Sequence, residues 1–168
     1  EALVYMAHWD NLGTHEGEAG VIIYNGAVDN ATGVAAILEL AEAFRKAKTP
    51  PKRSILFLAV TLEESGLLGS KYYVAHPVVP LDKTVAVVNL DALAPIGKAR
   101  DITVVGKGSS QLEDVLKSVL DSQQRTAVVE ENTAAGYYFR SDHFNFAKAG
   151  VPALYIDSGT DLVEGGKA

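Results

Sequence analysis

Residues 61–70, TLEESGLLGS, decide the fold together with the apolar run ILFLAV that precedes them at positions 55–60. A continuous apolar run of this length is typical of a strand that is buried on both faces of a parallel sheet. Two adjacent carboxylates, Glu63 and Glu64, follow it after Thr61 and Leu62. Because a buried carboxylate without a partner is costly or takes up a proton, we expect a cationic group opposite this pair.

Composition limits the classes of protein to consider. The chain has 168 residues, enough for one domain with a substantial core. Its formal net charge is −6 and it has no basic run, which argues against nucleic acid as a partner. No apolar run approaches the roughly 20 residues that span a bilayer, so no membrane span is expected. Because the chain has no cysteine, a metal would need histidine, aspartate or glutamate ligands.

Patterns typical of strands and helices alternate along the chain. Residues 11–20, rich in glycine and polar side chains, are expected to form a loop. The other expected elements are strands at 2–8, 21–24, 54–60, 84–90, 102–105, 126–129 and 151–156, and helices that begin near 30, 67, 110 and 141. This alternation predicts an α/β fold with a mostly parallel central sheet and helices on both faces.

Polar residues are expected to mark the beginnings of the helices. Asp29 or Asn30 would cap the first helix, and Ser110 with Glu113 forms a capping-box pattern before the third. Residues 141–143 would cap a short last helix. The third helix has apolar residues at helical spacing that are expected to face the core, namely Leu112, Val115, Leu116, Val119 and Leu120.

Several acidic and histidine residues are expected at the sheet edge where parallel α/β sheets bind ligands. His8 ends the first strand, and Glu63 and Glu64 follow the third. Asp91 follows the fourth strand, and Asp29 precedes a helix at the same edge. One histidine with several carboxylates suits zinc, manganese or cobalt. A carboxylate that two ions share is the usual device of a two-metal hydrolytic site.

Ordinary explanations exist for each residue alone, and other catalytic motifs do not fit. A strand-end histidine, a capping aspartate and a turn aspartate are common, but their coincidence at one edge favours a metal site.

The chain lacks a Gly-x-Ser-x-Gly nucleophile elbow. HEGEA at 15–19 lacks the second histidine of His-Glu-x-x-His. GKGSS at 106–110 lacks the Walker spacing and is expected to be a turn.

Five ordered motifs resemble a known family. They are AHWD at 7–10, GAVDNATG at 26–33, EESGLLGS at 63–70, NLD at 89–91 and RSDH at 140–143. Together they resemble the co-catalytic zinc aminopeptidases of the aminopeptidase Y and leucyl aminopeptidase type, in the clan of glutamate carboxypeptidase. The resemblance implies a three-layer sandwich fold and hydrolysis of the amino-terminal bond of peptides with a free N-terminus. It also implies a secreted or periplasmic location.

The same resemblance implies a set of metal ligands. His8 and Asp91 would bind the first zinc, Asp29 would bridge two zincs, and Glu64 would bind the second. The peptide bond after the bridging aspartate is typically cis in the family, so a cis bond between Asp29 and Asn30 is expected.

Further residues receive roles in the reaction by resemblance. Glu63 would be the general base that takes a proton from metal-activated water. Asp10 would orient the neighbouring histidine ligand. His143 and Tyr138 are expected to contribute to the substrate pocket.

The sequence departs from the family pattern at one zinc ligand. The family's fifth ligand is a histidine in a Tyr-His motif downstream of RSDH, and no such motif follows here. We therefore expect one zinc to be held well and the second weakly. We also expect residues 1–168 to be a partial catalytic domain that lacks N-terminal and C-terminal portions, with exposed apolar surface that favours self-association. Two alternatives stay open: a glutaminyl cyclase-like single-zinc acyl transferase, and a non-catalytic or truncated inactive module.

Overall fold

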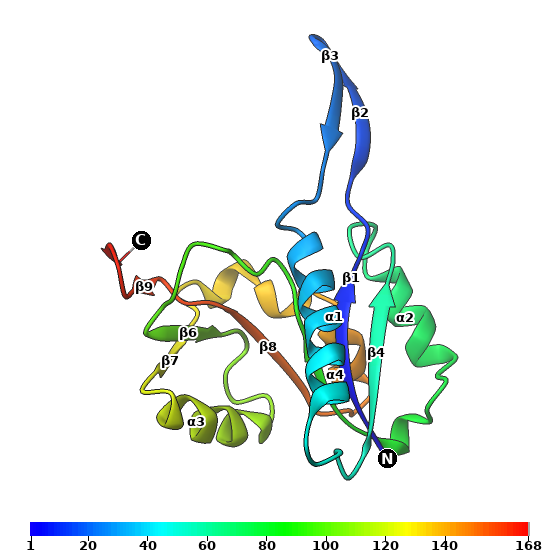
Figure 1. Cartoon of the computed structure of the whole chain (residues 1–168). Coiled ribbons are helices and arrows are strands. Elements are labelled where there is room, and N and C mark those ends of the chain that lie inside the picture. Colours follow the sequence, from blue (N-terminus) through cyan, green and yellow to red (C-terminus); the bar gives the residue numbers. More distant parts are fainter. Residues whose placement is uncertain (168) are drawn as a thin grey trace.

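A six-stranded sheet forms the centre of the computed structural model, which describes residues 1–167 (Figure 1). The strand order is β4-β1-β5-β8-β6-β7, and neighbouring strands are parallel except β6 and β8. The strands are β1 (Ala2–His8), β4 (Ser54–Val60), β5 (Thr84–Asn89), β6 (Asp101–Val104), β7 (Thr126–Val129) and β8 (Ala153–Ser158). The expected α/β class with a mostly parallel sheet is confirmed.

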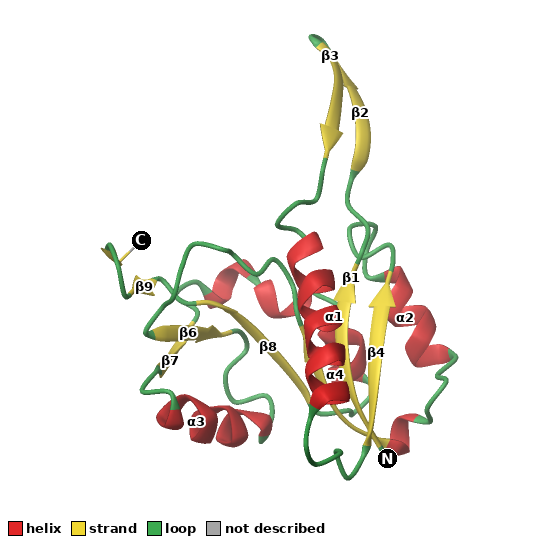
Figure 2. Cartoon of the chain, viewed as in Figure 1, coloured by secondary structure: helices red, strands yellow, loops and turns green. Residues whose placement is uncertain are grey.

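Helices cover both faces of this sheet (Figure 2). They are α1 (Ala31–Lys46), α2 (Leu68–Ala75), α3 (Leu112–Ser122) and α4 (His143–Lys148), with short 3₁₀ turns η1 (Leu81–Lys83), η2 (Thr133–Ala135) and η3 (Tyr137–Phe139). Successive residues of a strand point to opposite faces. Accordingly, Val4 and Met6 of β1 pack with α2 and α4, whereas Tyr5 and Ala7 pack with α1. No helix within residues 1–167 has the length and apolar character needed to cross a membrane.

Helix α1 begins where its sequence predicts. The Asn30 side chain accepts a hydrogen bond from the Gly33 main-chain N–H at 2.9 Å, so Asn30 is the cap. A Cβ atom at Gly33 would lie 2.3 Å from the Leu90 carbonyl oxygen, which explains the glycine. The close approach holds the start of α1 against the end of β5.

The segment that was expected to be a loop forms half of a hairpin. β2 (Gly13–Gly17) pairs antiparallel with β3 (Gly20–Tyr24), and the hairpin projects away from the sheet and helices (Figure 1). β2 reads GTHEG and lacks apolar alternation, so only main-chain pairing with β3 reveals it as a strand. Two further short strands, β9 (Asp161–Leu162) and β10 (Gly166–Lys167), pair near the C-terminus.

Two expectations about burial are wrong. β4 is an edge strand that pairs only with β1, and Val60 is its one buried residue. In α3 only Leu120 is buried, while Val115 and Val119 are 62% and 47% exposed. The apolar patterns predicted the elements correctly. They did not show how many neighbours cover each element.

The capping prediction for α3 is confirmed in part, and that for α4 is wrong. Ser110 Oγ accepts a hydrogen bond from the Leu112 main-chain N–H at 3.1 Å, whereas Glu113 accepts from the main-chain N–H groups of Gly108 and Ser109 instead of that of Ser110. Asp142 makes no side-chain capping bond to α4. Ser141, in the same segment, hydrogen bonds elsewhere, as described below.

Candidate metal centre

The carboxyl ends of three neighbouring strands bring together two predicted ligands, His8 and Asp91, and the predicted general base Glu63. β1 lies between β4 and β5, parallel to both, and His8 at its end is paired with Val60 of β4. Glu63 and Asp91 lie just beyond the ends of β4 and β5. Ligand atoms of His8, Glu63 and Asp91 all lie within 4.8 Å of one another. The convergence that the strand pattern predicts is therefore present.

His8 is the buried centre of this cluster. Its Nε2 atom lies 3.1 Å from Asp29 Oδ1 and 3.2 Å from Asp91 Oδ1. Its Nδ1 atom donates a hydrogen bond to the main-chain carbonyl of Asp10 at 3.1 Å. This bond places a proton on Nδ1 and leaves Nε2 to face the carboxylates, as a metal ligand requires. The Asp10 carboxylate lies 3.6 Å from Nδ1, so the contact to His8 is chiefly through its main chain.

Ser141 supports the Asp91 carboxylate through a buried hydrogen bond. Its hydroxyl donates a hydrogen bond to Asp91 Oδ2 and accepts one from Asn89 Nδ2 at 2.6 Å. All three residues are buried. The capping role predicted for the Ser141 side chain is therefore incorrect. Its place in the RSDH motif, and that of Asn89 in NLD, was the available signal.

Asp29 and Glu64 are linked through a residue that sequence reasoning missed. Asn11 Nδ2 donates to the Asp29 main-chain carbonyl at 2.6 Å and to Glu64 Oε1 at 3.3 Å. Asn11 directly follows the AHWD motif, which was the only sequence signal. The Asp29–Asn30 peptide bond is cis, as expected.

The turn at 61–70 fixes the position of Glu63. The Glu63 main-chain N–H donates to Asp10 Oδ1 at 3.2 Å, and its carbonyl accepts from the Leu67 N–H at 2.9 Å. The Gly69 N–H donates to the Thr61 carbonyl at 3.0 Å. A Cβ at Gly69 would lie 2.2 Å from that oxygen, so the tight turn requires glycine. Asp10 therefore contacts both His8 and the segment that carries Glu63.

The crowded carboxylates change the acidity of the cluster. Burial, reinforced by the charges of Asp91 and other carboxylates, raises the pKa of Glu63 to about 8 despite the opposing charge of His8. Burial by itself would lower the pKa of His8, but the hydrogen bond and charge of Asp91 outweigh it and raise this pKa to about 9. The pKa of Asp29 is raised by burial and by Asp91.

His143 and Tyr138, the predicted pocket residues, pack against each other. His143 is fully buried between the rings of Tyr138 and Tyr155, each centred 4.8 Å away. Within residues 1–167 neither ring nitrogen of His143 has a hydrogen-bond partner, and burial lowers its pKa to about 4. Phe139, and not Tyr138, lines the pocket beside Glu63. A substrate-binding role for His143 and Tyr138 stays a prediction.

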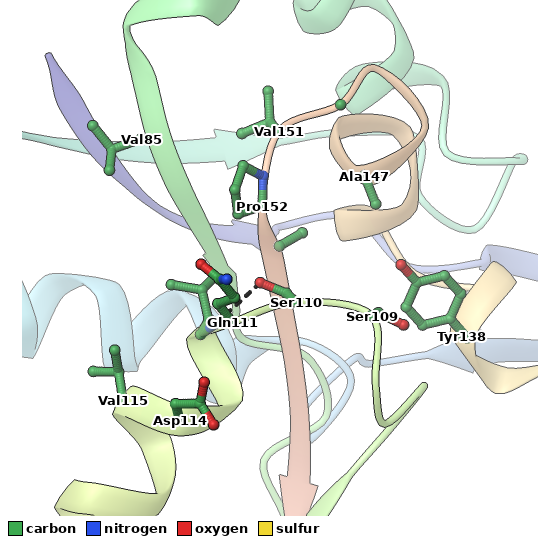
Figure 3. A pocket seen from close by; sticks show the side chains of 13 residues that line it. Val85, Ser109, Ser110, Gln111, Asp114, Val115, Tyr138, Ala147, Val151 and Pro152 are labelled. Carbon is green, nitrogen blue, oxygen red and sulfur yellow. Dashed lines mark hydrogen bonds between the residues drawn. The ribbon is translucent and has the colours of Figure 1, made fainter.

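Tyr138 instead lines a larger cavity of about 880 Å³ (Figure 3). This cavity lies between the start of α3, with Ser110 and Val115, and the α4–β8 connection, with Val151 and Pro152. None of the predicted metal ligands lines it. The larger hollow therefore does not coincide with the metal centre.

An α/β sheet that collects a histidine and several carboxylates at its carboxyl edge defines a candidate divalent-metal protein. The family model of peptidase family M28 matches residues 1–164. The chain therefore belongs to peptidase family M28, as the five motifs indicated.

Curated relatives share the sequence over part of their length. Leupeptin-inactivating enzyme 1 of Streptomyces exfoliatus is 32% identical over 140 residues, which are 83% of this chain and 30% of that protein. Aminopeptidase YwaD of Bacillus subtilis is 29% identical over 96% of this chain and 34% of its own length. The chain thus spans about a third of the length of these relatives.

Solved structures share the fold. The LapA aminopeptidase of Legionella pneumophila is 26% identical, with a TM-score of 0.73 over 94% of this chain and 41% of LapA. Glutaminyl cyclase of Porphyromonas gingivalis is 21% identical, with a TM-score of 0.69 over 99% of this chain and 62% of its own. The second likeness shows the fold alone.

Proposed function

We propose that this chain carries the catalytic centre of a zinc-dependent aminopeptidase, which hydrolyses the amino-terminal bond of peptides with a free N-terminus. The observation that carries the proposal is the convergence of His8, Glu63 and Asp91 at one sheet edge, with Asp29 in contact with His8. Membership of peptidase family M28 supports it. So do relatives named as an aminopeptidase and as probable zinc metalloproteases.

The donor set fits a divalent cation. Imidazole nitrogen and carboxylate oxygen are the zinc ligands available to a chain without cysteine. Within residues 1–167 the ion-pair partner of Asp29 and Asp91 is His8, and no lysine or arginine neutralises them. The excess negative charge of the cluster would therefore be compensated by a bound cation. His8, Asp91 and Asp29 would hold a first zinc, and Asp29 with Glu64 offers fewer ligands for a second.

The proposed reaction uses Glu63 as the proton carrier. Zinc, when bound, polarises the scissile carbonyl and lowers the pKa of a water molecule. Glu63 takes a proton from the attacking water, whose oxygen forms the new bond to the carbonyl carbon. The C–N bond then breaks, and Glu63 returns the proton to the leaving amine. The Asp10 bond to the Glu63 main chain holds this carboxylate beside the cluster.

An amino-acid amide hydrolysis assay with zinc titration tests the proposal. We expect leucine release that depends on zinc, and a loss of about 10²–10⁴-fold in kcat for Glu63→Gln, which cannot carry the proton. Unchanged zinc content in that variant separates base loss from metal loss. Equal activity of Glu63→Gln would refute the assigned role. Pyroglutamate formation from a glutaminyl peptide, without amino-acid release, would instead support a cyclase.

Zinc stoichiometry tests the ligand assignment separately. We propose one tightly held ion and one weakly held ion per chain, because only the first has three protein ligands here. Metal analysis after dialysis should give about one zinc per chain. Two retained zincs would contradict the ligand assignment.

Two further properties are part of the proposal. A secreted or periplasmic location, inferred by resemblance, is tested by fractionating the source cells. Self-association through exposed apolar surface is supported by the exposure of Val115 and Val119 on α3. Light scattering across protein concentrations tests it.

A further inference from the structure

A pocket of about 520 Å³ is lined by Glu63 and Glu64 and also by three cationic residues. Lys71 comes from α2, Arg140 follows η3, and Lys148 ends α4. These three residues, called the cationic wall below, come from three separate elements around one hollow. The volume is within the range of sites that bind small molecules.

The charge of the cationic wall is not neutralised by the protein. Within residues 1–167, none of its three members forms an ion pair with an aspartate or glutamate. Arg140 instead stacks over the ring of Tyr137, 5.5 Å from its centroid. The acidic residues of the pocket are the two glutamates at the metal centre. In a chain of net charge −6, this is a local concentration of unpaired positive charge.

Side-chain hydrogen bonds hold α4, which carries Lys148, against the segment beside the candidate metal centre. Asn145 of α4 donates hydrogen bonds to the Leu67 carbonyl at 3.1 Å and to Ser70 Oγ at 2.8 Å. These bonds fasten α4 to the turn that carries the glutamates. Phe144 is one helical turn before Lys148 and lines the same pocket, so both lie on one face of α4.

We propose that the cationic wall binds a carboxylate of the substrate, so that the site prefers peptides with a carboxylate close to the free amino terminus. The inference rests on the proposed aminopeptidase function. The carboxylates of the metal centre attract the substrate amine, and the cationic wall repels it. A substrate carboxylate is attracted by the cationic wall and repelled by the carboxylates of the site. A substrate with both charges therefore fits the site in one orientation. The carboxylate belongs either to the C-terminus of a short peptide or to an acidic side chain.

Calorimetric binding to the zinc-loaded Glu63→Gln chain tests the proposal without turnover. Leucylglycine is compared with leucylglycine amide, and glutamylglycine amide with glutaminylglycine amide, so that each pair differs by one negative charge. We expect the charged member of at least one pair to bind about fivefold more tightly, and Lys71→Gln and Lys148→Gln each to reduce that ratio about two- to fivefold. Raised salt should reduce the ratio further.

The matched control is Lys48→Gln, which removes the same charge in the exposed connection between α1 and β4 and should leave the ratio unchanged. If only leucylglycine binds more tightly than its amide, the bound carboxylate is the peptide C-terminus. If only glutamylglycine amide binds more tightly than glutaminylglycine amide, the bound carboxylate is an acidic side chain. Ratios near one in both pairs would overturn the inference, as would ratios that Lys71→Gln and Lys148→Gln do not change. Leucine amide, which has no carboxylate, reports separately on the proposed function when the unmodified chain is assayed.

Discussion

Replacing Asn30 by alanine should destabilise the fold far more than an ordinary cap substitution. Asn30 is 2% exposed and makes three side-chain hydrogen bonds. Its Oδ1 atom accepts from the Gly33 N–H at 2.9 Å and the Ala92 N–H at 3.2 Å, and its Nδ2 atom donates to the Leu90 carbonyl at 3.0 Å. One side chain therefore joins the start of α1 to the segment that follows β5.

The magnitude follows from these contacts. Losing a helix cap costs about 1 kcal/mol. Leaving the Leu90 carbonyl buried without a donor adds about 1–3 kcal/mol. We therefore expect Asn30→Ala to lower the free energy of unfolding by about 2–4 kcal/mol, a large part of the roughly 5–15 kcal/mol of a typical domain.

Urea unfolding followed by far-UV circular dichroism, with a chelator present, measures this effect without a contribution from metal binding. Asn132→Ala is the matched control. The Asn132 side chain caps the 3₁₀ turn η2 by accepting a hydrogen bond from the Ala135 N–H at 3.2 Å, but Asn132 is exposed. It should cost less than about 1 kcal/mol. Equal losses for the two variants would refute the argument that Asn30 acts as a buried link.

Three further predictions concern the metal centre and the surface. Ser141→Ala should weaken zinc binding about 10- to 100-fold, measured in competition with a chromophoric chelator, because Asp91 loses the hydroxyl group that donates to it. Unchanged zinc affinity would count against a supporting role for Ser141. In the metal-free protein, the pKa values of about 9 for His8 and about 8 for Glu63 mean that the folded chain keeps protons that the unfolded chain releases. Stability should therefore fall between pH 6.5 and pH 8, seen as a lower thermal midpoint that excess zinc restores, and a midpoint that rises with pH would contradict this. Val115→Ser with Val119→Ser should change stability by less than about 1 kcal/mol, because both side chains are exposed. The same pair should lower the mass seen by light scattering if α3 mediates self-association, and an unchanged oligomer would exclude that surface.

The predictable part of the candidate metal centre is the part that strand geometry determines. His8 ends a strand with a clear apolar pattern, Glu63 and Asp91 each come just after one, and parallel strands bring their carboxyl ends to one edge. The supporting bonds were not predictable in this way. Ser141 reaches Asp91 across 50 positions of sequence, and Asn11 reaches Glu64 across 53. No local pattern encodes such pairs, because they depend on how loops return to the sheet.

The fold shows the same division between local pattern and tertiary context. The apolar run of β4 predicted a strand but not its position at the sheet edge, because edge strands and central strands can both be rich in apolar residues. β2 was not predicted because GTHEG shows neither the two-residue apolar period of a strand nor the 3.6-residue apolar period of a helix. Only its antiparallel pairing with β3 makes it a strand. The apolar residues of α3 have helical spacing, yet Leu120 alone is buried.

The projecting hairpin offers a place to attach other molecules to this chain. Its two five-residue strands carry the turn at residues 18–19 roughly 15 Å from the root of the hairpin. Exposed turns of this kind tolerate inserted sequence well, because no buried main-chain group is disturbed. A reporter domain or an immobilisation tag inserted between Glu18 and Ala19 should therefore leave the six-stranded sheet, and the candidate metal ligands at its edge, in place.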